Sequence, residues 1–440
     1  MEYDLNRGML KLFSLILLLL ITTTLNASKV FDFDLIKKGN DNNNTLLVIG
    51  GIQGDEPGGF VSASILSTHY EITSGSVWIV PNLNFYSIIE RSRGPYGDMN
   101  RKFANLSKKD PEYKTIQRIK SYIKDERVKL VVNLHDGSGY YRKTYEDKMH
   151  SPHKWGQCSI IDQSNLDIAQ YGNLEDISSK VVAHVNKNLL TDEDIYNVHN
   201  TQTKNGDKEM EKSLTYFAIN QGKAAFGNEA SKNLPTHKRV YYHLLALEKY
   251  MDIMGIKYKR KFKLTSKGVY GAINNDIYIS LYDGKISLPL SKIRDTIKYF
   301  PIKKNGEVDF KASNPLLKIV KKGSSYNIHY GNRRLSKLSA DYFEYDNSRK
   351  SVKFQIDGKT QDIEFGSIVD VKRDFLVKTD KNYRINVIGY TNKKNKETDI
   401  KIKKSQIMKK HSIDKKGDIY RVEYYSKNKF AGMVLVKFRS

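Results

Sequence analysis

Cysteine is almost absent from this chain, since Cys158 is the only one in 440 residues. A single cysteine excludes an internal disulfide, and a lone thiol is more often inert than catalytic. Proline is scarce, with 9 residues, whereas tyrosine is abundant, with 29. This balance favours β-strands. The hydrophobic content of 39% and the mean hydropathy of −0.57 are typical of a globular protein that folds in water.

The chain also lacks an apolar run long enough to span a membrane comfortably. Its strongest candidate, residues 12–21, follows the basic residues Arg7 and Lys11 and precedes a small residue, Ala27. A basic stretch, a short apolar core and a small residue predict a signal peptide over residues 1–27. An uncleaved anchor is the alternative. Either way we expect an exported protein, which argues against nucleic acid as a partner.

The first part of the chain has no excess of either charge. Residues 1–256 hold 31 Lys and Arg against 30 Asp and Glu, whereas residues 257–440 hold 43 against 19. The net charge of +25 therefore lies almost entirely in the second part. In an exported protein, this favours an anionic polymer or surface as the partner, such as a cell wall. A lysine-rich proteome is the alternative explanation.

Helix and strand patterns alternate up to about residue 256. Strand-like runs lie at 45–50, 76–81 and 130–134, and helix-like stretches at 59–69, 111–125 and 236–254. Asp110 and Pro111 predict the N-cap and first residue of the second helix, Thr236 caps the third, and Gly255 ends it. The alternation predicts an α/β domain with a mixed sheet flanked by helices.

Short alternating runs and hairpin turns follow residue 256. The runs lie at 276–282, 285–290, 351–356, 360–365, 383–390, 418–425 and 430–438. Asp283-Gly284 and Asp357-Gly358 are strong hairpin signals. We expect an α/β domain at 28–256, a β-rich domain at 257–366 and an Ig-like β-sandwich at 367–440, with the last boundary near Gly366.

Three candidate metal ligands follow predicted strands. Gln53 and Glu56 lie in a glycine-rich turn directly after the apolar run 46–49, and His135 follows the run 130–134. Strand ends in an open α/β sheet deliver ligands to one edge, and a catalytic zinc takes three protein ligands and keeps one open position. A glycine-rich turn beside an ordinary buried histidine is the structural alternative.

Two further segments carry candidate chemistry. Arg93, Asn100 and Arg101 lie on a loop shaped by glycine and proline, and guanidinium and amide groups suit a carboxylate ligand. Glu229 interrupts an apolar strand-like stretch, where a carboxylate is costly unless it has a task such as general base catalysis. A loop arginine without function and a salt-bridged glutamate are the alternatives.

Taken together, these motifs resemble the zinc carboxypeptidases of the M14 type. That family has four motifs in a fixed order: His-x-x-Glu, Asp-Leu-Asn-Arg-x-Phe, a histidine and a glutamate. This chain has counterparts in the same order, namely Gln53-Gly-Asp-Glu56, the run at 98–103, His135 and Glu229. The run Asn82–Phe85, with Arg91 or Arg93 after it, resembles a further family region. The resemblance covers about residues 40–255, and the whole layout resembles the cell-shape DL-carboxypeptidases of curved Gram-negative bacteria, which use Gln in the first metal position.

The resemblance implies a role for each motif residue. Gln53, Glu56 and His135 would hold the metal, and Arg93 would polarise the scissile carbonyl. Glu229 would deprotonate the attacking water and later protonate the leaving amine.

Substrate-binding roles follow from the same resemblance. Asn100 and Arg101 would bind the terminal carboxylate of the substrate. The tyrosine that covers the substrate in many relatives has no clear match, and Thr215 and Tyr216 are the pocket candidates at its usual distance before Glu229.

Glutamine in place of histidine changes the expected metal chemistry. Both side chains are neutral, but an amide oxygen is a harder donor than an imidazole nitrogen, so we expect weaker Zn²⁺ affinity and easier replacement by Ca²⁺ or another divalent ion. Asp98 should accept a hydrogen bond from the Gln53 amide and turn its oxygen toward the metal.

The resemblance implies a periplasmic enzyme that trims peptidoglycan tripeptide stems to dipeptides and releases meso-diaminopimelate. The basic second part would attach the enzyme to the anionic wall or bind a cell-shape protein. A deacylase of small N-acyl amino acids and a non-catalytic wall-binding protein with a degenerate metal site are the alternatives.

Overall fold

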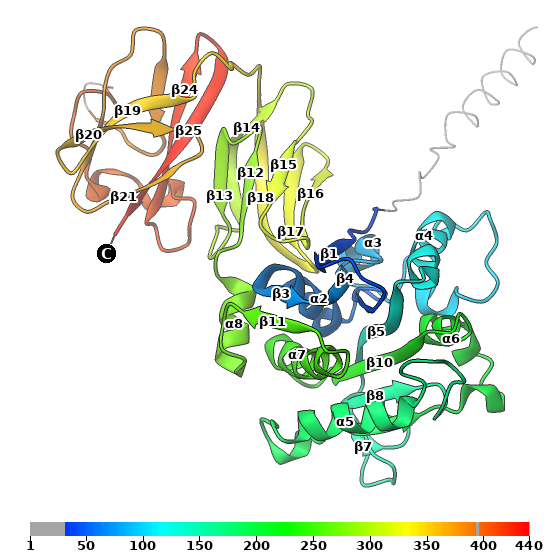
Figure 1. Cartoon of the computed structure of the whole chain (residues 1–440). Helices are drawn as coiled ribbons and strands as arrows, with labels where there is room; N and C mark the ends of the chain where they lie inside the picture. The colour runs from blue at the N-terminus through cyan, green and yellow to red at the C-terminus, as the bar shows by residue number, and fades with distance from the viewer. Residues whose placement is uncertain (1–30, 393–395, 440) are drawn as a thin grey trace, which may run out of the picture.

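The computed structural model describes residues 31–392 and 396–439 (Figure 1). The predicted signal peptide, residues 1–27, lies outside the described residues. Within the described part, no helix is long and apolar enough to cross a membrane. An α/β part, a middle β part and a C-terminal β-sandwich follow one another along the chain.

The α/β part is built on one seven-stranded mixed sheet with the order β1-β4-β2-β5-β10-β8-β9. The central strands β4, β2, β5 and β10 run parallel, whereas β1 and β8 join them antiparallel. The seven strands are β1 (Ile36–Gly39), β2 (Thr45–Ile49), β4 (Ser76–Val80), β5 (Val128–Gly137), β8 (Cys158–Ile161), β9 (Asn197–Asn200) and β10 (Ala224–Ser231). Because β2 and β4 are buried along their whole length, they read as nearly continuous apolar runs in the sequence, whereas the equally buried β10 carries Asn228 and Glu229.

Helices cover the sheet and confirm the expected α/β class. The longest ones are α2 (Pro57–His69), α4 (Tyr113–Lys124), α5 (Leu174–Asn186) and α7 (Thr236–Ile253), and α3 (Phe85–Glu90) and α6 (Leu214–Ile219) are short. Helix α7 packs against α2 and α5, whereas α4 and α6 contact the sheet elsewhere (Figure 1). One apolar cluster joins these helices to the sheet.

Two helix starts differ from expectation. Helix α4 begins at Tyr113 with Glu112 as its N-cap, not with Asp110 and Pro111. The reason is that Asp110 accepts a hydrogen bond from the Glu112 backbone at 2.8 Å and forms a turn before the helix. Thr236 is the first helical residue of α7 rather than its cap, which is Pro235.

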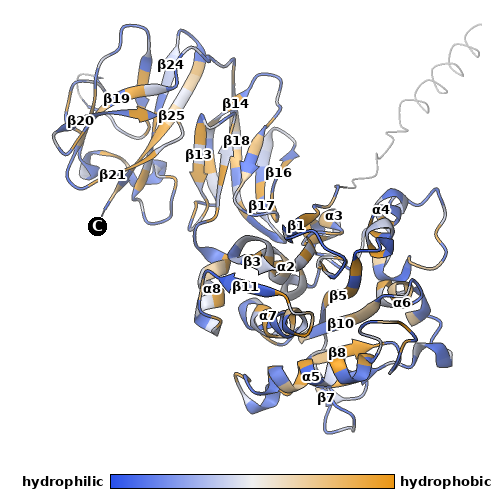
Figure 2. Ribbon diagram, in the orientation of Figure 1, coloured by the Kyte–Doolittle hydropathy of each residue, from blue (hydrophilic) through white to orange (hydrophobic). Residues whose placement is uncertain are grey.

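The α/β part continues beyond residue 256. Strand β11 (Lys257–Arg260) pairs antiparallel with β3 (Tyr70–Ser74), and α8 (Ser266–Asn274) packs on α7. Figure 2 shows β8 in hydrophobic colours and the edge strand β11 in hydrophilic ones. We therefore propose that this part extends to about residue 274 rather than 256.

The middle part contains two sheets. A three-stranded sheet has the order β13-β12-β15, and a four-stranded sheet has the order β14-β18-β17-β16. The strands are β12 (Tyr278–Leu281), β13 (Ile286–Pro289), β14 (Thr296–Lys303), β15 (Phe310–Ala312), β16 (Leu317–Lys322), β17 (Ser325–Tyr330) and β18 (Arg333–Phe343). The runs at 276–282 and 285–290 predict β12 and β13, whereas the other five strands were not predicted.

The C-terminal part is a sandwich of two sheets, with the orders β20-β19-β22 and β21-β25-β24-β23. Its strands are β19 (Ser351–Ile356), β20 (Lys359–Glu364), β21 (Ile368–Val371), β22 (Phe375–Val377), β23 (Arg384–Val387), β24 (Ile419–Ser426) and β25 (Lys429–Phe438). Side chains of both sheets share one core. The expected boundary near Gly366 would separate both β19 and β20 from this core, so we propose a boundary before Ser351 instead.

Candidate active site

The turn after β2 carries Gln53 and Glu56, and α2 begins directly after it with Pro57. Both side chains are buried, with 2% and 4% of the residue surface exposed. The turn packs tightly on α3, because a Cβ atom at Gly54 would lie only 2.0 Å from the backbone oxygen of Ser87. The close packing of this turn therefore holds both side chains at the carboxyl end of the sheet.

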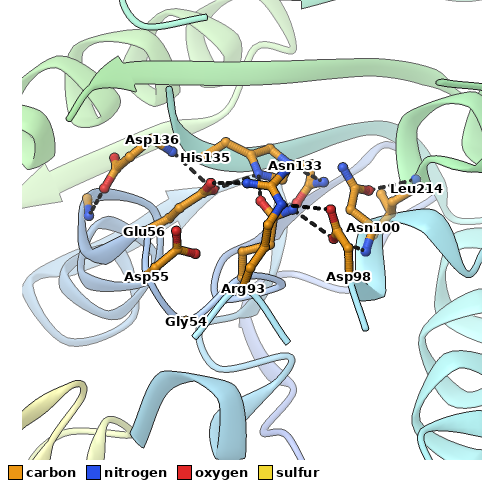
Figure 3. A network of polar contacts seen from close by, with 12 residues as sticks. Gly54, Asp55, Glu56, Arg93, Asp98, Asn100, Asn133, His135, Asp136 and Leu214 are labelled. Carbon is orange, nitrogen blue, oxygen red and sulfur yellow. Dashed lines mark hydrogen bonds and ion pairs between the residues drawn. The ribbon is translucent and has the colours of Figure 1, made fainter. Parts of the chain in front are cut away.

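Three polar atoms from the strand ends converge in this region. His135 Nδ1 lies 2.9 Å from Glu56 Oε2 and 3.1 Å from Gln53 Oε1 (Figure 3). The imidazole is buried in β5, and its Nε2 faces Asn133 at 2.7 Å. An imidazole nitrogen, a carboxylate oxygen and an amide oxygen thus share one point, which is a ligand set for a divalent ion.

Asp98 orients the glutamine. Gln53 Nε2 donates to Asp98 Oδ1 at 2.8 Å, which is the hydrogen bond that the sequence predicts, and leaves Gln53 Oε1 facing His135. Burial raises the pKa of Asp98, but the hydrogen bond from Gln53 and the charge of Arg93 lower it on balance. Asp98 is therefore a stable acceptor for the amide.

The amide oxygen is needed to complete the ligand set. Over residues 31–392 and 396–439, no group of three or more His, Cys, Asp and Glu side chains is placed to hold a metal ion. Glu56 and His135 become a three-ligand site only when Gln53 is counted. The donor chemistry fits a divalent ion, with a harder ligand in the position where zinc enzymes commonly use nitrogen.

The two arginines and the asparagine face the same cavity. Arg93 Nε donates to Asp98 Oδ2 at 2.9 Å, and its Nη1 lies 3.5 Å from Glu56 Oε1, so its guanidinium lies beside the ligand set (Figure 3). Asn100 Oδ1 accepts from the Leu214 backbone at 3.0 Å, which fixes its side chain. Arg101 Nη1 donates to the Asn100 backbone oxygen at 3.1 Å. Three side chains with N–H donors are thus available to an anionic ligand.

Glu229 lies on β10 opposite His135 of β5 in the register of the sheet. Only 8% of its surface is exposed, and its Oε2 is buried without a hydrogen-bond partner in the described part of the chain. Burial raises the pKa of Glu229 well above its usual range, and the charges of Glu56 and Asp136 raise it further. A desolvated carboxyl group beside a ligand set is typical of a general base.

These side chains line one cavity of about 330 Å³. Of the predicted site residues, Tyr216 and Asp98 do not line it: Tyr216 lies in the first turn of α6, and Asp98 lies behind Gln53. The predicted residues that line it are Gln53, Glu56, Arg93, Asn100, Arg101, His135, Thr215 and Glu229.

Several lining residues, including Lys232 and Trp155, are not among those that the sequence predicts. Lys232 Nζ lies 2.8 Å from Asp55 Oδ2 and 3.4 Å from Glu56 Oε1. Burial lowers the pKa of Lys232, but Glu56 and Asp55 raise it on balance. Its place three residues after Glu229, at the end of the same strand, is the signal that could have identified it.

A buried polar network supports the strand ends from α7. Asp136 Oδ2 accepts from the Gly58 backbone at 2.7 Å and from Arg239 Nη1 at 3.1 Å, and its Oδ1 lies 3.3 Å from His243 Nε2. His243 Nδ1 lies 2.9 Å from Asn228. Since Asp136 follows His135 and Asn228 precedes Glu229, the network fixes the backbone on which both functional side chains stand.

A mixed α/β sheet that gathers a three-ligand site and a buried carboxyl group at its edge defines a metal-dependent hydrolase. Residues 9–274 match the family described as the catalytic domain of carboxypeptidases that control helical cell shape, and residues 345–439 match the C-terminal domain of metallo-carboxypeptidases. The chain belongs to this metallocarboxypeptidase family.

Solved structures agree with the assignment. The tripeptide-bound cell shape determinant Csd4 of Helicobacter pylori is 40% identical, with a TM-score of 0.86, over 93% of this chain and 100% of that chain. Its product-bound form is 41% identical with a TM-score of 0.86 over the same shares. The form bound to mDAP, named a D,L-carboxypeptidase, is 41% identical, with a TM-score of 0.85, over 92% and 100%. No curated protein matches the chain.

Proposed function

We propose that this protein is a periplasmic DL-carboxypeptidase that trims peptidoglycan tripeptide stems to dipeptides, releases meso-diaminopimelate and thereby influences cell shape. One observation carries the proposal: Gln53, Glu56 and His135 converge in a cavity that also holds the buried Glu229, whose Oε2 has no hydrogen-bond partner among the described residues. Family membership and the Helicobacter pylori structures bound to tripeptide, product and mDAP support the substrate class.

Gln53 Oε1, Glu56 Oε2 and His135 Nδ1 would hold the metal, for which we propose Zn²⁺ with replacement by Ca²⁺ or another divalent ion. A bound divalent ion polarises a carbonyl and lowers the pKa of water. Glu56 is the only anionic side chain in this set, and the amide of Gln53 adds a hard donor.

The remaining side chains bind the substrate and move protons. Asn100 and Arg101 bind the C-terminal carboxylate, because the Asn100 oxygen is already used by the Leu214 backbone and its amide N–H groups remain to donate. Arg93, beside Glu56, donates to the scissile carbonyl oxygen as negative charge develops on it. Thr215 lines the same cavity and would contact the substrate.

Glu229 takes a proton from the attacking water and passes it to the leaving amine. The water oxygen forms a bond to the carbonyl carbon, the C–N bond breaks, and the products are a new carboxylate on the shortened stem and a free amino group. The desolvated surroundings of Glu229 make its carboxylate a stronger base than one in water.

The experiment that tests the proposal is incubation of the metal-loaded protein with muramyl tripeptide and muramyl tetrapeptide. We expect release of diaminopimelate from the tripeptide alone, detected by chromatography. Release of the terminal residue from the tetrapeptide, or hydrolysis only of small N-acyl amino acids, would contradict the proposed substrate specificity. Absence of hydrolysis with all of these compounds would indicate a non-catalytic wall-binding protein.

We further propose that the basic second part holds the enzyme at the anionic wall. Residues 257–440 carry 24 more basic than acidic residues. A cell-shape protein that binds the same surface is the competing partner.

A further inference from the structure

A basic cavity lies where the middle part meets the sandwich. It measures about 790 Å³ and lies between the start of β14 and the segment that leads into β24. Its lining residues include Arg294, Asp295, Lys298, Tyr299, Lys410, His411, Lys415 and Arg421. We call this the basic cleft.

The positive charge of the residues that line the basic cleft does not follow from the high lysine content of this part of the chain alone. Five lining residues are Lys or Arg, and Asp295, the one lining acid, is 2.7 Å from Lys415. A second cavity of about 590 Å³ at the same junction is lined by three lysines and three aspartates, and so is balanced. Both cavities lie between the same two parts of one chain, so a lysine-rich composition alone would make both of them basic. Only one of them is basic, so composition alone does not explain the charge of the basic cleft.

The arginines of the basic cleft are held in place from both sides. Arg294 Nε donates to Ser412 Oγ at 2.9 Å, and its Nη2 donates to the Lys409 backbone at 2.7 Å. Arg421 of β24 donates to the backbone oxygens of Tyr299 and Lys298 on β14 at 3.2 and 3.0 Å. Each arginine therefore links the middle part to the sandwich, so the cleft is fixed before any ligand binds.

Two lysines of the basic cleft are not neutralised, whereas Lys415 pairs with Asp295 at 2.7 Å and Arg421 with Glu423 at 3.0 Å. Lys298 and Lys410 are exposed, and neither forms an ion pair with an acid in the described part of the chain. Burial lowers the pKa of His411, and the charges of Lys410, Arg421 and Arg294 lower it further. The imidazole thus lies in a positive potential, which is the environment that attracts an anion.

An aromatic side chain stands at the edge of the basic cleft. Tyr299 is 69% exposed, and its backbone has a φ of 52°, in the left-handed region that non-glycine residues rarely adopt. It lies in the bulge where the β14–β18 register shifts between Ile297 and Phe300. Such bulges re-aim side chains, and an exposed tyrosine offers a flat apolar face together with a hydroxyl group.

We propose that the basic cleft binds a peptidoglycan strand, with its cations on stem-peptide carboxylates and Tyr299 against a sugar ring. The choice of peptidoglycan rests on the proposed function, which brings this protein to a polymer with carboxylates at regular intervals. A concave site between two rigid parts suits a polymer chain better than a flat bilayer. The basic cleft would thus hold the enzyme on the wall while the active site, on another part of the chain, acts on a stem.

The test is co-sedimentation of the full chain with purified Gram-negative sacculi, in a Glu229→Gln background that keeps the stems intact. Lys298→Glu with Lys410→Glu should weaken binding about tenfold at low salt, because two attractions become repulsions. Lys292→Glu with Lys437→Glu, in the balanced cavity, changes the net charge equally and should leave binding within about twofold. Co-sedimentation with vesicles of phosphatidylglycerol, measured in parallel, tests whether the basic cleft binds an anionic lipid surface instead.

A tyrosine pair tests the aromatic contact. Tyr299→Ala should weaken sacculus binding about threefold, whereas Tyr278→Ala, which removes an exposed tyrosine from the balanced cavity, should not. Equal loss in both lysine pairs, no loss in either, or binding to vesicles but not to sacculi would overturn the proposal. Hydrolysis of soluble muramyl tripeptide, with Glu229 restored, should be unchanged in all these variants, so failure of the cleft and failure of the proposed function are distinguishable.

Discussion

At the scale of single residues, we propose that Gln53 decides which metal ion the site binds. Its amide is fixed by Asp98, so the oxygen rather than the nitrogen faces His135 and Glu56. The charge of the ligand set is the same as with histidine, but the donor is harder. We therefore expect the metal preference of this site to depend on the hardness of the donor atom rather than on the charge of the ligand set.

Replacement of Gln53 by histidine should tighten Zn²⁺ binding by about tenfold or more, because zinc favours an imidazole nitrogen over an amide oxygen. Competition with a chromogenic zinc chelator measures the change. Gln221→His is the control, since Gln221 is exposed and does not line the cavity that holds the ligand set. Unchanged zinc affinity in Gln53→His would count against Gln53 as a ligand.

Replacement of Glu229 by glutamine should lower turnover of muramyl tripeptide by about 10²–10⁴, because the variant cannot accept a proton. Bound metal, measured by atomic absorption, should remain at the wild-type level. Glu193→Gln, at an exposed glutamate, is the control. Full turnover in Glu229→Gln would refute the general base, and loss of metal would mean that Glu229 acts as a ligand instead.

Much of the site could be predicted because its motifs are short and local. Gln53 and Glu56 share one turn, and the hydrogen bond between Gln53 and Asp98 follows from two such motifs meeting at one sheet edge. Lys232 and Trp155 could not be found, because their place in the cavity depends on how loops after different strands pack. Tyr216 was misplaced since sequence separation does not say which face of α6 it occupies.

At the scale of elements, the close packing of α2 on β5 brings Glu56 to His135. A Cβ atom at Gly58 would lie 2.1 Å from Asp136 Oδ1, and one at Gly59 would lie 2.5 Å from the Leu134 backbone oxygen. The glycine pair is therefore required by the approach of the helix to the strand, and the metal site depends on that approach.

Substitution of Gly58 by alanine should lower the free energy of unfolding by about 1–3 kcal/mol and weaken metal binding, because the helix must move away from Asp136. Gly271→Ala in α8 is the matched control, since its Cβ atom would meet only the Asn275 amide at 3.4 Å and alanine favours a helix. Denaturant midpoints measure both. Equal stability of the two variants would contradict the packing argument.

His199 of β9 gives the fold a sensitivity to acid. Its ring stacks on Tyr141 at 4.0 Å, its Nδ1 is buried without a hydrogen-bond partner in the described part of the chain, and burial lowers its pKa to about 4. Because the unfolded chain binds a proton near pH 6.5 and the folded one does not, the contribution to stability is complete above pH 6.5 and falls between pH 6.5 and 4.

Replacement of His199 by glutamine should flatten the pH dependence of thermal unfolding across this window. His153→Gln is the control, because the His153 side chain lies at the surface. A profile that is equally steep in His199→Gln and the wild type would show that other groups cause the acid sensitivity.

Strands with clear alternation were predictable, and strands without it were not. The run at 351–356 is β19 to the residue, whereas β14 and β18 escaped notice. Strand β14 pairs in parallel with β18 at the edge of its sheet, and its burial does not alternate, so neither a hairpin turn nor an apolar period reveals it. Strand β18 follows β17 across the turn Gly331-Asn332, which is a hairpin signal from which β18 could have been predicted. The strand conformation of β14 is decided by tertiary pairing.

At the scale of the whole molecule, charge and chemistry are separated along the chain. The ligand set and its cavity lie before residue 233, whereas the excess basic charge lies after residue 256. Charge segregation could be predicted from the sequence. The boundary that we propose before Ser351 could not, because it depends on β22 returning to pair with β19 across Gly366. Strand-like segments can be located in a sequence, but the sequence does not reveal which of them pair in one sheet.

The central claim is that this chain hydrolyses a stem peptide through a metal held by Gln53, Glu56 and His135. The most direct measurement is the rate of diaminopimelate release from muramyl tripeptide as metal-free protein is titrated with Zn²⁺. We predict no release without metal, a linear rise to saturation at about one ion per chain, and no rise with Glu56→Gln. Full release in the presence of chelator, or none at saturating metal, would contradict the account.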